Sequence, residues 1–122
     1  MLDLIIKNGS CYIDKDLKGQ DIGIKDGKII KIGKIDSEVK ETFDAKGLTV
    51  LPGCIDTQTH FREPGSTDTE DLHSGSRAAI VGGITSVFEM PNTNPPTSTK
   101  VEFQKKLDLA KLTSNPTCVI IG

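Results

Sequence analysis

Cysteine is scarce in this sequence and follows no recognisable spacing. Three cysteines occur among the 122 residues, Cys11, Cys54 and Cys118, and no CxxC motif is present. An odd and scattered set argues against both a disulfide framework and a thiolate zinc site. Each cysteine is therefore expected to be a small, buried apolar residue, and a reducing, cytoplasmic location is expected for the protein.

Long hydrophobic runs and clusters of positive charge are missing as well. No apolar stretch approaches the roughly 18 residues of a membrane-spanning helix, and residues 1–7 are too few and wrongly charged for a signal peptide. The formal net charge is −2, and no basic run of the kind that binds nucleic acid occurs. The sequence thus predicts a protein that binds neither membranes nor nucleic acid.

Residues 1–51 are predicted to form a small antiparallel sheet with one apolar face. Strand-like segments occur at residues 3–7, 11–13, 21–25 and 28–32, with further extended pieces near residues 43 and 48–51. The first two segments are expected to pair as a hairpin, and Asp26-Gly27 between the next two is the strongest short hairpin signal in the chain. We expect no catalytic residue here, and we expect the apolar face to be exposed unless something covers it.

Residues 52–122 show a different pattern. Strands are predicted at residues 53–56, 84–88 and 118–121, and they alternate with helices that run from residue 69 to Gly82-Gly83 and over residues 99–111. The continuous apolar run at residues 84–88 is typical of a strand buried on both faces of a parallel sheet. The order β-α-β-α-β predicts a parallel, right-handed α/β arrangement.

Polar side chains gather where two of these strands end. After an apolar run at residues 50–55, Gln58, His60 and Arg62 alternate, so an extended backbone would point all three the same way. A carboxamide, an imidazole and a guanidinium on one face can bind a metal or an anion. A second strand end carries the sequence MPNT at residues 90–93, and the two ends of a βαβ unit are expected to lie side by side.

These motifs together resemble the start of a dihydroorotase of the amidohydrolase superfamily. The matching stretches are Asp56-x-Gln58-x-His60-Phe-Arg62-Glu-Pro-Gly65, then AAxxGGIT at residues 78–85 and MPNT at residues 90–93. In this superfamily, His-x-Arg followed by Met-Pro-Asn-Thr is typical of dihydroorotases rather than of allantoinases or dihydropyrimidinases. One position departs from the resemblance, because the family usually has His-x-His where this chain has Gln58-x-His60.

The resemblance implies the start of a metal-dependent (β/α)₈ TIM barrel over residues 52–122, preceded by part of a small β-sandwich over residues 1–51. Such a barrel takes about 250 residues, so 122 residues cannot close it. We therefore expect this chain to be a portion of a longer protein. We also expect the 122 residues alone to have no hydrolase activity, and measurable ring opening of dihydroorotate by the isolated chain would contradict this.

The activity implied by the resemblance is the interconversion of N-carbamoyl-L-aspartate and (S)-dihydroorotate in pyrimidine (UMP) biosynthesis. In that family, two histidines from the first strand, a carboxylated lysine and two further histidines hold two zinc ions. A zinc ion polarises the amide carbonyl and lowers the pKa of bound water toward roughly 7. The lysine, the other histidines and a catalytic aspartate belong to later strands, so no catalytic residue is assigned within this chain.

Five residues receive a candidate role, four of them from the resemblance and Asp56 from its position before Gln58 and His60. His60 matches the second histidine of the first strand, a zinc ligand that lies against the substrate. Gln58 stands at the first histidine position, where a carboxamide is a poorer zinc ligand and can reduce the number of metals bound. Asp56 is expected either to orient His60 or to accept a hydrogen bond at the strand end. Arg62 and Asn92 match the family's contacts to the exocyclic carboxylate of dihydroorotate.

Two other functions fit the same residues. A catalytically silent dihydroorotase homologue would act as a structural partner of another pyrimidine enzyme, a reading that the Gln58 substitution motivates. A related allantoinase or hydantoinase would hydrolyse a ring without a carboxylate. Under the first reading the partner is a protein, either another copy or a pyrimidine-pathway enzyme, whereas under the enzymatic readings it is a small-molecule substrate.

Overall fold

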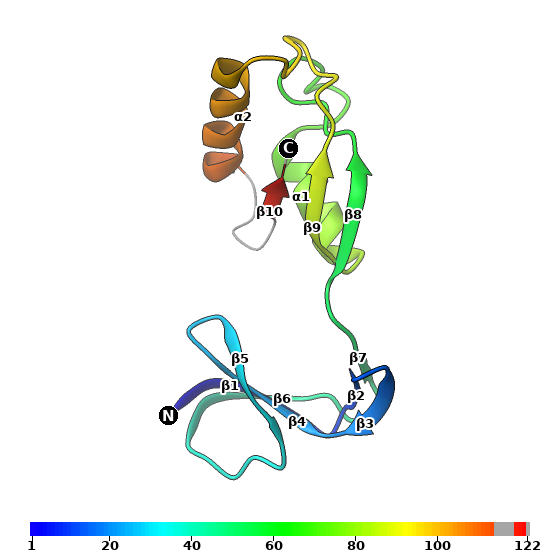
Figure 1. Cartoon of the computed structure of the whole chain (residues 1–122), viewed down its shortest axis with the longest axis vertical. Helices are drawn as coiled ribbons and strands as arrows, with labels where there is room; N and C mark the ends of the chain where they lie inside the picture. The colour runs from blue at the N-terminus through cyan, green and yellow to red at the C-terminus, as the bar shows by residue number, and fades with distance from the viewer. Residues whose placement is uncertain (114–118, 122) are drawn as a thin grey trace. The chain divides into compact units, whose positions relative to one another are not determined.

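The computed structural model describes residues 1–113 and 119–121. The chain divides into two compact units, Met1–Pro52 and Gly53–Gly122, and each is described by itself. The strands of the first unit are β1 (Leu2–Lys7), β2 (Ser10–Ile13), β3 (Asp16–Gly19), β4 (Asp21–Lys25), β5 (Lys28–Gly33), β6 (Val39–Asp44) and β7 (Thr49–Val50) (Figure 1). They form one sheet in the order β5-β4-β1-β6 and a second in the order β3-β2-β7.

The hairpin predicted at Asp26-Gly27 is confirmed. Strands β4 and β5 pair antiparallel up to Lys25 and Lys28, which directly flank the turn. Both turn residues have positive φ, 50° at Asp26 and 70° at Gly27. A two-residue turn with this backbone matches the right-handed twist of the strands it connects, and aspartate followed by glycine tolerates it best.

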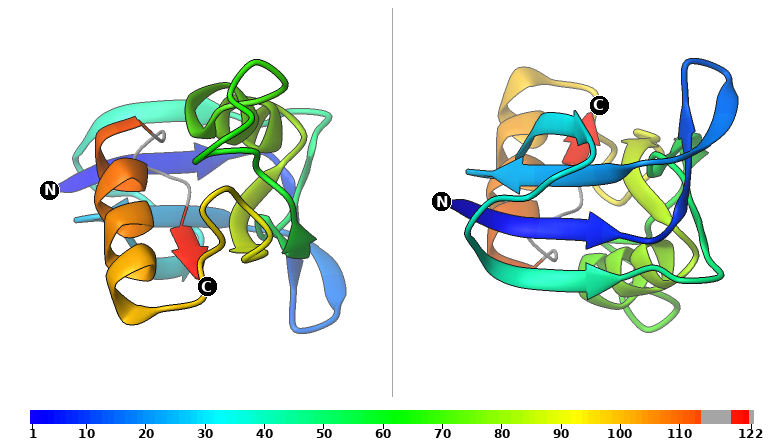
Figure 2. Two further views of the ribbon diagram at one scale, coloured as in Figure 1. Left: turned by 90° about the horizontal axis from the view of Figure 1, so that it is seen from above. Right: turned by 90° about the horizontal axis from the view of Figure 1, so that it is seen from below.

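The hairpin expected between residues 3–7 and 11–13 is wrong, and so is a purely antiparallel sheet. Strand β1 pairs antiparallel with β4 and parallel with β6, whereas β2 pairs antiparallel with β3 and parallel with β7. The right-hand view of Figure 2 shows β1 and β6 (dark blue and teal) pointing the same way, with β4 opposed. The reason is that residues 2–13 and 39–50 run side by side from one sheet into the other. The Ala45 N–H donates to the Lys7 carbonyl oxygen at 2.8 Å at this crossing.

The core of the first unit is small. Leu2, Ile5 and Ile35 are buried together, and Val39 packs against them. Many other large apolar side chains of this unit are exposed, as expected for a sheet with an uncovered apolar surface: Tyr12, Leu17, Ile29, Ile30, Ile32, Phe43, Leu48 and Leu51.

The second unit has the predicted β-α-β-α-β order. Its elements are β8 (Cys54–Thr59), α1 (Leu72–Val81), β9 (Ile84–Glu89), α2 (Lys100–Thr113) and β10 (Val119–Ile121), and the strands form a parallel sheet in the order β10-β9-β8. Cys118, the first residue of the predicted third strand, lies outside the described residues. Neither helix in the described part of the chain is long and apolar enough to cross a membrane.

Helix α1 begins three residues later than expected. Its N-cap is Asp71, whose carboxylate accepts a hydrogen bond from the Ser74 N–H at 2.6 Å, while the Ser74 side chain faces the Asp71 backbone in a capping box. An aspartate at this position satisfies backbone N–H groups that have no partner inside the helix. The helix ends at Gly82, as predicted.

Both helices cover one face of the parallel sheet. Val87 of β9 is buried with Leu72 of α1 and Ala110 of α2. The next residue, Phe88, is 38% exposed, because successive side chains of a strand point to opposite faces. The expectation that β9 is buried on both faces is therefore wrong for this chain, in which one face of the strand remains accessible.

We expect Leu72→Ala to lower the free energy of unfolding of the second unit by about 2–5 kcal/mol, because Leu72 is 0% exposed and its truncation leaves a cavity. Helical circular dichroism during urea unfolding measures this unit, since both helices belong to it. Val81→Ala on the same helix is the control, since Val81 is 90% exposed. Equal effects of the two substitutions would contradict the assigned core.

Candidate active site

The candidate site lies where β8 and β9 end side by side. The Met90 N–H donates to the Thr59 carbonyl oxygen at 2.8 Å, just beyond the last paired residues of the two strands. Farther out, the Asn94 N–H donates to the Pro64 carbonyl oxygen at 3.0 Å. The loops that follow the two strands are thus joined by backbone hydrogen bonds, and they hold polar side chains at the carboxyl edge of the sheet.

Gly65 allows these loops to approach closely. Its φ is +120°, and a Cβ built on it would lie 2.8 Å from the Asn94 Cβ and 2.9 Å from the Asn94 carbonyl oxygen. A larger residue would be strained by its backbone and would collide with the second loop. The Pro-Gly that ends the first motif therefore fixes the separation of the two loops.

His60 and Asn92 meet at the junction of the two loops. His60 Nδ1 lies 2.8 Å from Asn92 Oδ1. An amide oxygen only accepts hydrogen bonds, so His60 Nδ1 carries the proton and donates. The lone pair of the neutral ring is then on Nε2, which is the form of histidine that binds a metal with its orientation fixed by a second residue.

Gln58 and Asp56 lie one step back along β8. The Asp56 carboxylate accepts a hydrogen bond from the Gln58 backbone N–H at 3.0 Å. Two roles are expected for Asp56 from the sequence, to orient His60 or to accept a hydrogen bond at the strand end. The bond from Gln58 corresponds to the second role, whereas the His60 ring is hydrogen-bonded to Asn92. The pairing of β8 with β9 is irregular between Asp56 and Thr59, at the place where Gln58 is exposed.

Arg62 stands in the loop after β8, beyond the buried Phe61. Its side chain is exposed, and its carbonyl oxygen accepts the Ser66 N–H at 2.9 Å in the turn that follows. The loop thus presents a guanidinium near the end of the strand that carries His60. A carboxylate is the ligand that matches its planar arrangement of donors.

The side chains present fit part of a zinc site. His60 supplies an imidazole nitrogen and Gln58 a neutral oxygen, whereas a catalytic zinc takes three protein ligands. Within residues 1–113 and 119–121, no group of three or more histidine, cysteine, aspartate or glutamate side chains is placed to hold a metal. In the part of the chain that the structure describes, His60 and Gln58 are thus the two candidate ligands, fewer than a catalytic zinc requires.

Comparisons with known proteins show the family to which the chain belongs. Residues 49–120 match the Amidohydrolase family. The chain belongs to this family. It is 44% identical over 110 residues to an allantoinase of Escherichia coli O1:K1 / APEC, covering 89% of this chain and 24% of the relative. It is 43% identical over 111 residues to a dihydroorotase of Methanothermobacter thermautotrophicus, covering 91% of this chain and 25% of the relative.

Solved structures of hydantoinases share the fold of this amidohydrolase chain. An L-hydantoinase (dihydropyrimidinase) from Arthrobacter aurescens superposes with a TM-score of 0.89 and 33% identity, over 100% of this chain and 28% of that one. A D-hydantoinase gives a TM-score of 0.76 and 37% identity, over 93% of this chain and 25% of that one. The chain thus spans about a quarter of the length of these relatives.

Two acidic residues near the site have structural roles that the sequence did not reveal. The Glu63 carboxylate accepts the Leu72 N–H at 2.8 Å and satisfies the first turn of α1 from outside the helix. It precedes the helix by nine residues, too far for any local capping pattern. Glu89 is buried beside Lys106, and burial raises the pKa of its carboxyl, an effect that the Lys106 ammonium opposes.

The Lys106 side chain is only 6% exposed, although lysine is rarely buried without a partner. The helical spacing contains a signal for this burial. Lys106 lies three residues after Phe103 and four before the buried Ala110, on the stripe of α2 that faces the sheet. A charged residue on such a stripe calls for a buried partner, and Glu89 supplies it.

We expect Asn92→Leu to change the tautomer of His60, because leucine removes the acceptor of the Nδ1 proton. In the parent chain the neutral His60 ring should be protonated at Nδ1, and in the variant protonation at Nε2 should increase. The ¹⁵N chemical shifts of the ring measure this at a pH where the imidazole is neutral. His73 on α1 is the internal control, and an unchanged His60 spectrum would contradict the assigned hydrogen bond.

Proposed function

We propose that this chain forms part of a metal-dependent hydrolase that opens or closes a cyclic amide. Family membership supports this, as do relatives named for allantoin, dihydroorotate and hydantoin, which are all cyclic amides. The position of His60 at the carboxyl end of a parallel strand also supports it, since barrel enzymes place their catalytic groups there. The whole activity is a property of the longer relatives and is proposed here by analogy with them.

His60 would contribute Nε2 to zinc, and Gln58 would offer its carboxamide oxygen beside it. Bound zinc would polarise the amide carbonyl and lower the pKa of a bound water. The residues of this chain would hold that metal in place, because the Nδ1–H···Oδ1 bond to Asn92 fixes both the tautomer and the plane of the His60 ring.

We further propose dihydroorotate as the substrate, within pyrimidine biosynthesis in the cytoplasm. The carrying observation is the orientation of Asn92, whose Oδ1 accepts from His60. This leaves the amide NH₂ group to donate to a substrate carboxylate, and Arg62 on the neighbouring loop provides the matching charge. Dihydroorotate has an exocyclic carboxylate, whereas allantoin and hydantoin lack one.

We expect Arg62→Ala in the complete enzyme to lower kcat/KM for dihydroorotate about 10- to 100-fold, because a hydrogen-bonded charged contact contributes about 1.5–3 kcal/mol. Steady-state kinetics measures this. Arg77→Ala is the matched control, since Arg77 is exposed on α1. If Arg62→Ala left dihydroorotate turnover unchanged, or if the parent enzyme preferred allantoin, the carboxylate assignment would be wrong.

The second candidate is a catalytically silent homologue that assembles with another copy or with a pyrimidine enzyme. Gln58 favours this candidate, because a carboxamide replaces an imidazole among the expected metal ligands.

We expect Gln58→His to raise the zinc content of the complete protein if the site is a working metal centre. Elemental analysis after equilibration with zinc measures the content, and Gln104→His on the exposed side of α2 is the control. Equal zinc content in the parent and in both variants would favour the silent homologue.

A further inference from the structure

One charged side chain of helix α2, that of Lys106, is buried next to the candidate site. Lys106 Nζ forms an ion pair with Glu89 Oε2, and the two side chains are 6% and 1% exposed. Nζ also donates to the Met90 carbonyl oxygen at 3.3 Å. The pair therefore joins α2 to the last residue of β9, which is Glu89 itself, and to Met90, the first residue of the loop that carries Asn92.

The same pair reaches the end of β8. The Phe61 backbone N–H faces the Glu89 carboxylate, and Phe61 directly follows His60. The Phe61 side chain packs in the cluster that contains Ala110 of α2. Three segments far apart in the sequence, the ends of β8 and β9 and the middle of α2, thus meet at one carboxylate and one ammonium.

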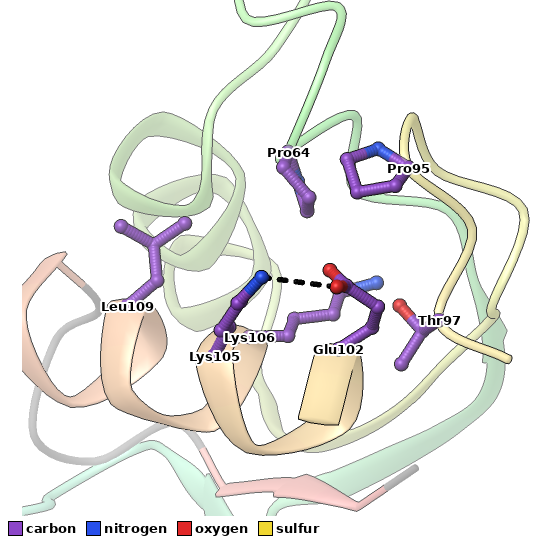
Figure 3. A pocket seen from close by; sticks show the side chains of 7 residues that line it. All are labelled: Pro64, Pro95, Thr97, Glu102, Lys105, Lys106 and Leu109. Atoms are coloured by element: carbon purple, nitrogen blue, oxygen red, sulfur yellow. Dashed lines mark hydrogen bonds and ion pairs between the residues drawn. The ribbon is translucent and has the colours of Figure 1, made fainter. Parts of the chain in front are cut away.

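An exposed pair on the same helix provides a contrast. Lys105 and Glu102 form an ion pair at 3.0 Å, drawn as the dashed line in Figure 3, and the Lys105 side chain is 68% exposed. These two residues line an open groove of about 200 Å³ together with Lys106, Pro64 and Pro95. Exposed pairs of this kind contribute little to stability, and the hydrogen bond of this pair joins two residues of the same helix.

The buried pair is poorly explained by stability alone. Burying two charged groups costs desolvation free energy that an exposed pair does not lose. Replacing a buried ion pair with apolar residues of similar size is therefore often neutral or stabilising. The pair has a clearer effect on geometry than on stability, because charge-assisted hydrogen bonds fix the positions of the atoms that they join. Here those atoms belong to α2, to the end of β9 and to Met90, and the Phe61 N–H beside the Glu89 carboxylate adds the residue that follows His60.

We propose that Lys106 and Glu89 are positioning residues, which hold the ends of β8 and β9 against α2 and so keep His60 within hydrogen-bonding distance of Asn92. This rests on the proposed function only in taking those strand ends as the active site. The pair itself does not touch the substrate. Its role is to set the separation and register of the residues that do.

The test compares two double variants of the 122-residue chain. Glu89→Leu/Lys106→Met replaces the buried pair with apolar residues, and Glu102→Leu/Lys105→Met does the same to the exposed pair on the same helix. Amide hydrogen exchange is followed by NMR at Met90 and Asn94, whose N–H groups join the two loops. The Cys54 N–H, which donates to the Gly83 carbonyl oxygen at 2.9 Å at the opposite end of β8, is the internal control.

Loss of the buried pair should speed exchange at Met90 and Asn94 about tenfold or more, with Cys54 unchanged, because only the strand ends open locally. The ¹⁵N shifts of the His60 ring should move away from the Nδ1-protonated form in the same variant. The exposed-pair variant should change neither. Parent-like exchange at Met90 and Asn94 would overturn the proposal, and so would equal acceleration at Cys54, which would indicate a global structural role.

If the apolar double variant does not fold, Glu89→Gln/Lys106→Met serves for the same comparison, because it removes both charges and keeps a side chain of the shape of glutamate at position 89. Faster exchange at Met90 and Asn94 with Cys54 unchanged would again support the proposal, and parent-like exchange or equal acceleration at Cys54 would overturn it. The measurement uses no substrate, so an inactive protein would not affect it. Conversely, a negative result here would leave the Arg62 test of the proposed function standing.

Discussion

The structure of the candidate site depends on the parallel pairing of β8 with β9. Parallel strands end at the same edge of a sheet, so residues more than thirty positions apart come into contact without any long loop reaching across. The Met90 N–H bond to the Thr59 carbonyl oxygen extends this pairing past the strands. His60 directly follows Thr59, and Asn92 follows Met90 by two residues, so the parallel pairing brings the two side chains to the same edge of the sheet.

Around this edge of the sheet, three carboxylates form hydrogen bonds or ion pairs within the fold. Glu63 satisfies the start of α1, Asp56 satisfies the Gln58 backbone, and Glu89 pairs with Lys106. Each of these carboxylates has a partner within the fold. Under the proposed function, Arg62 and the Asn92 amide NH₂ group would be the groups that meet an anionic substrate. A site that binds an anion benefits when nearby carboxylates are already engaged, because like charge would otherwise weaken the attraction.

The sequence predicts features that depend on local pattern and misses those that depend on distant partners. The alternation of strands and helices after residue 52 and the turn at Asp26-Gly27 are encoded by short stretches, and both are found as expected. Which strand pairs with β1 depends on residues 39–44, and no local signal specifies that choice. The adjacency of His60 and Asn92 follows from a topological rule. The burial of Lys106 needed its partner Glu89, which stands seventeen residues earlier.

The parallel pairing of β1 with β6 also determines the order in which the first unit assembles. The β4–β5 hairpin closes over a two-residue turn, and hairpins of this kind form within about 1–10 μs. Strand β1, by contrast, pairs with β6 at positions thirty-seven residues apart, such as Leu2 with Val39, so this half of the sheet must wait for a much longer loop to close. On a ribosome, β1 emerges before β6 and acquires this neighbour only after residue 44 has been synthesised. Until then its unpaired edge is open to other chains, and its single lysine, Lys7, offers little electrostatic protection against such pairing.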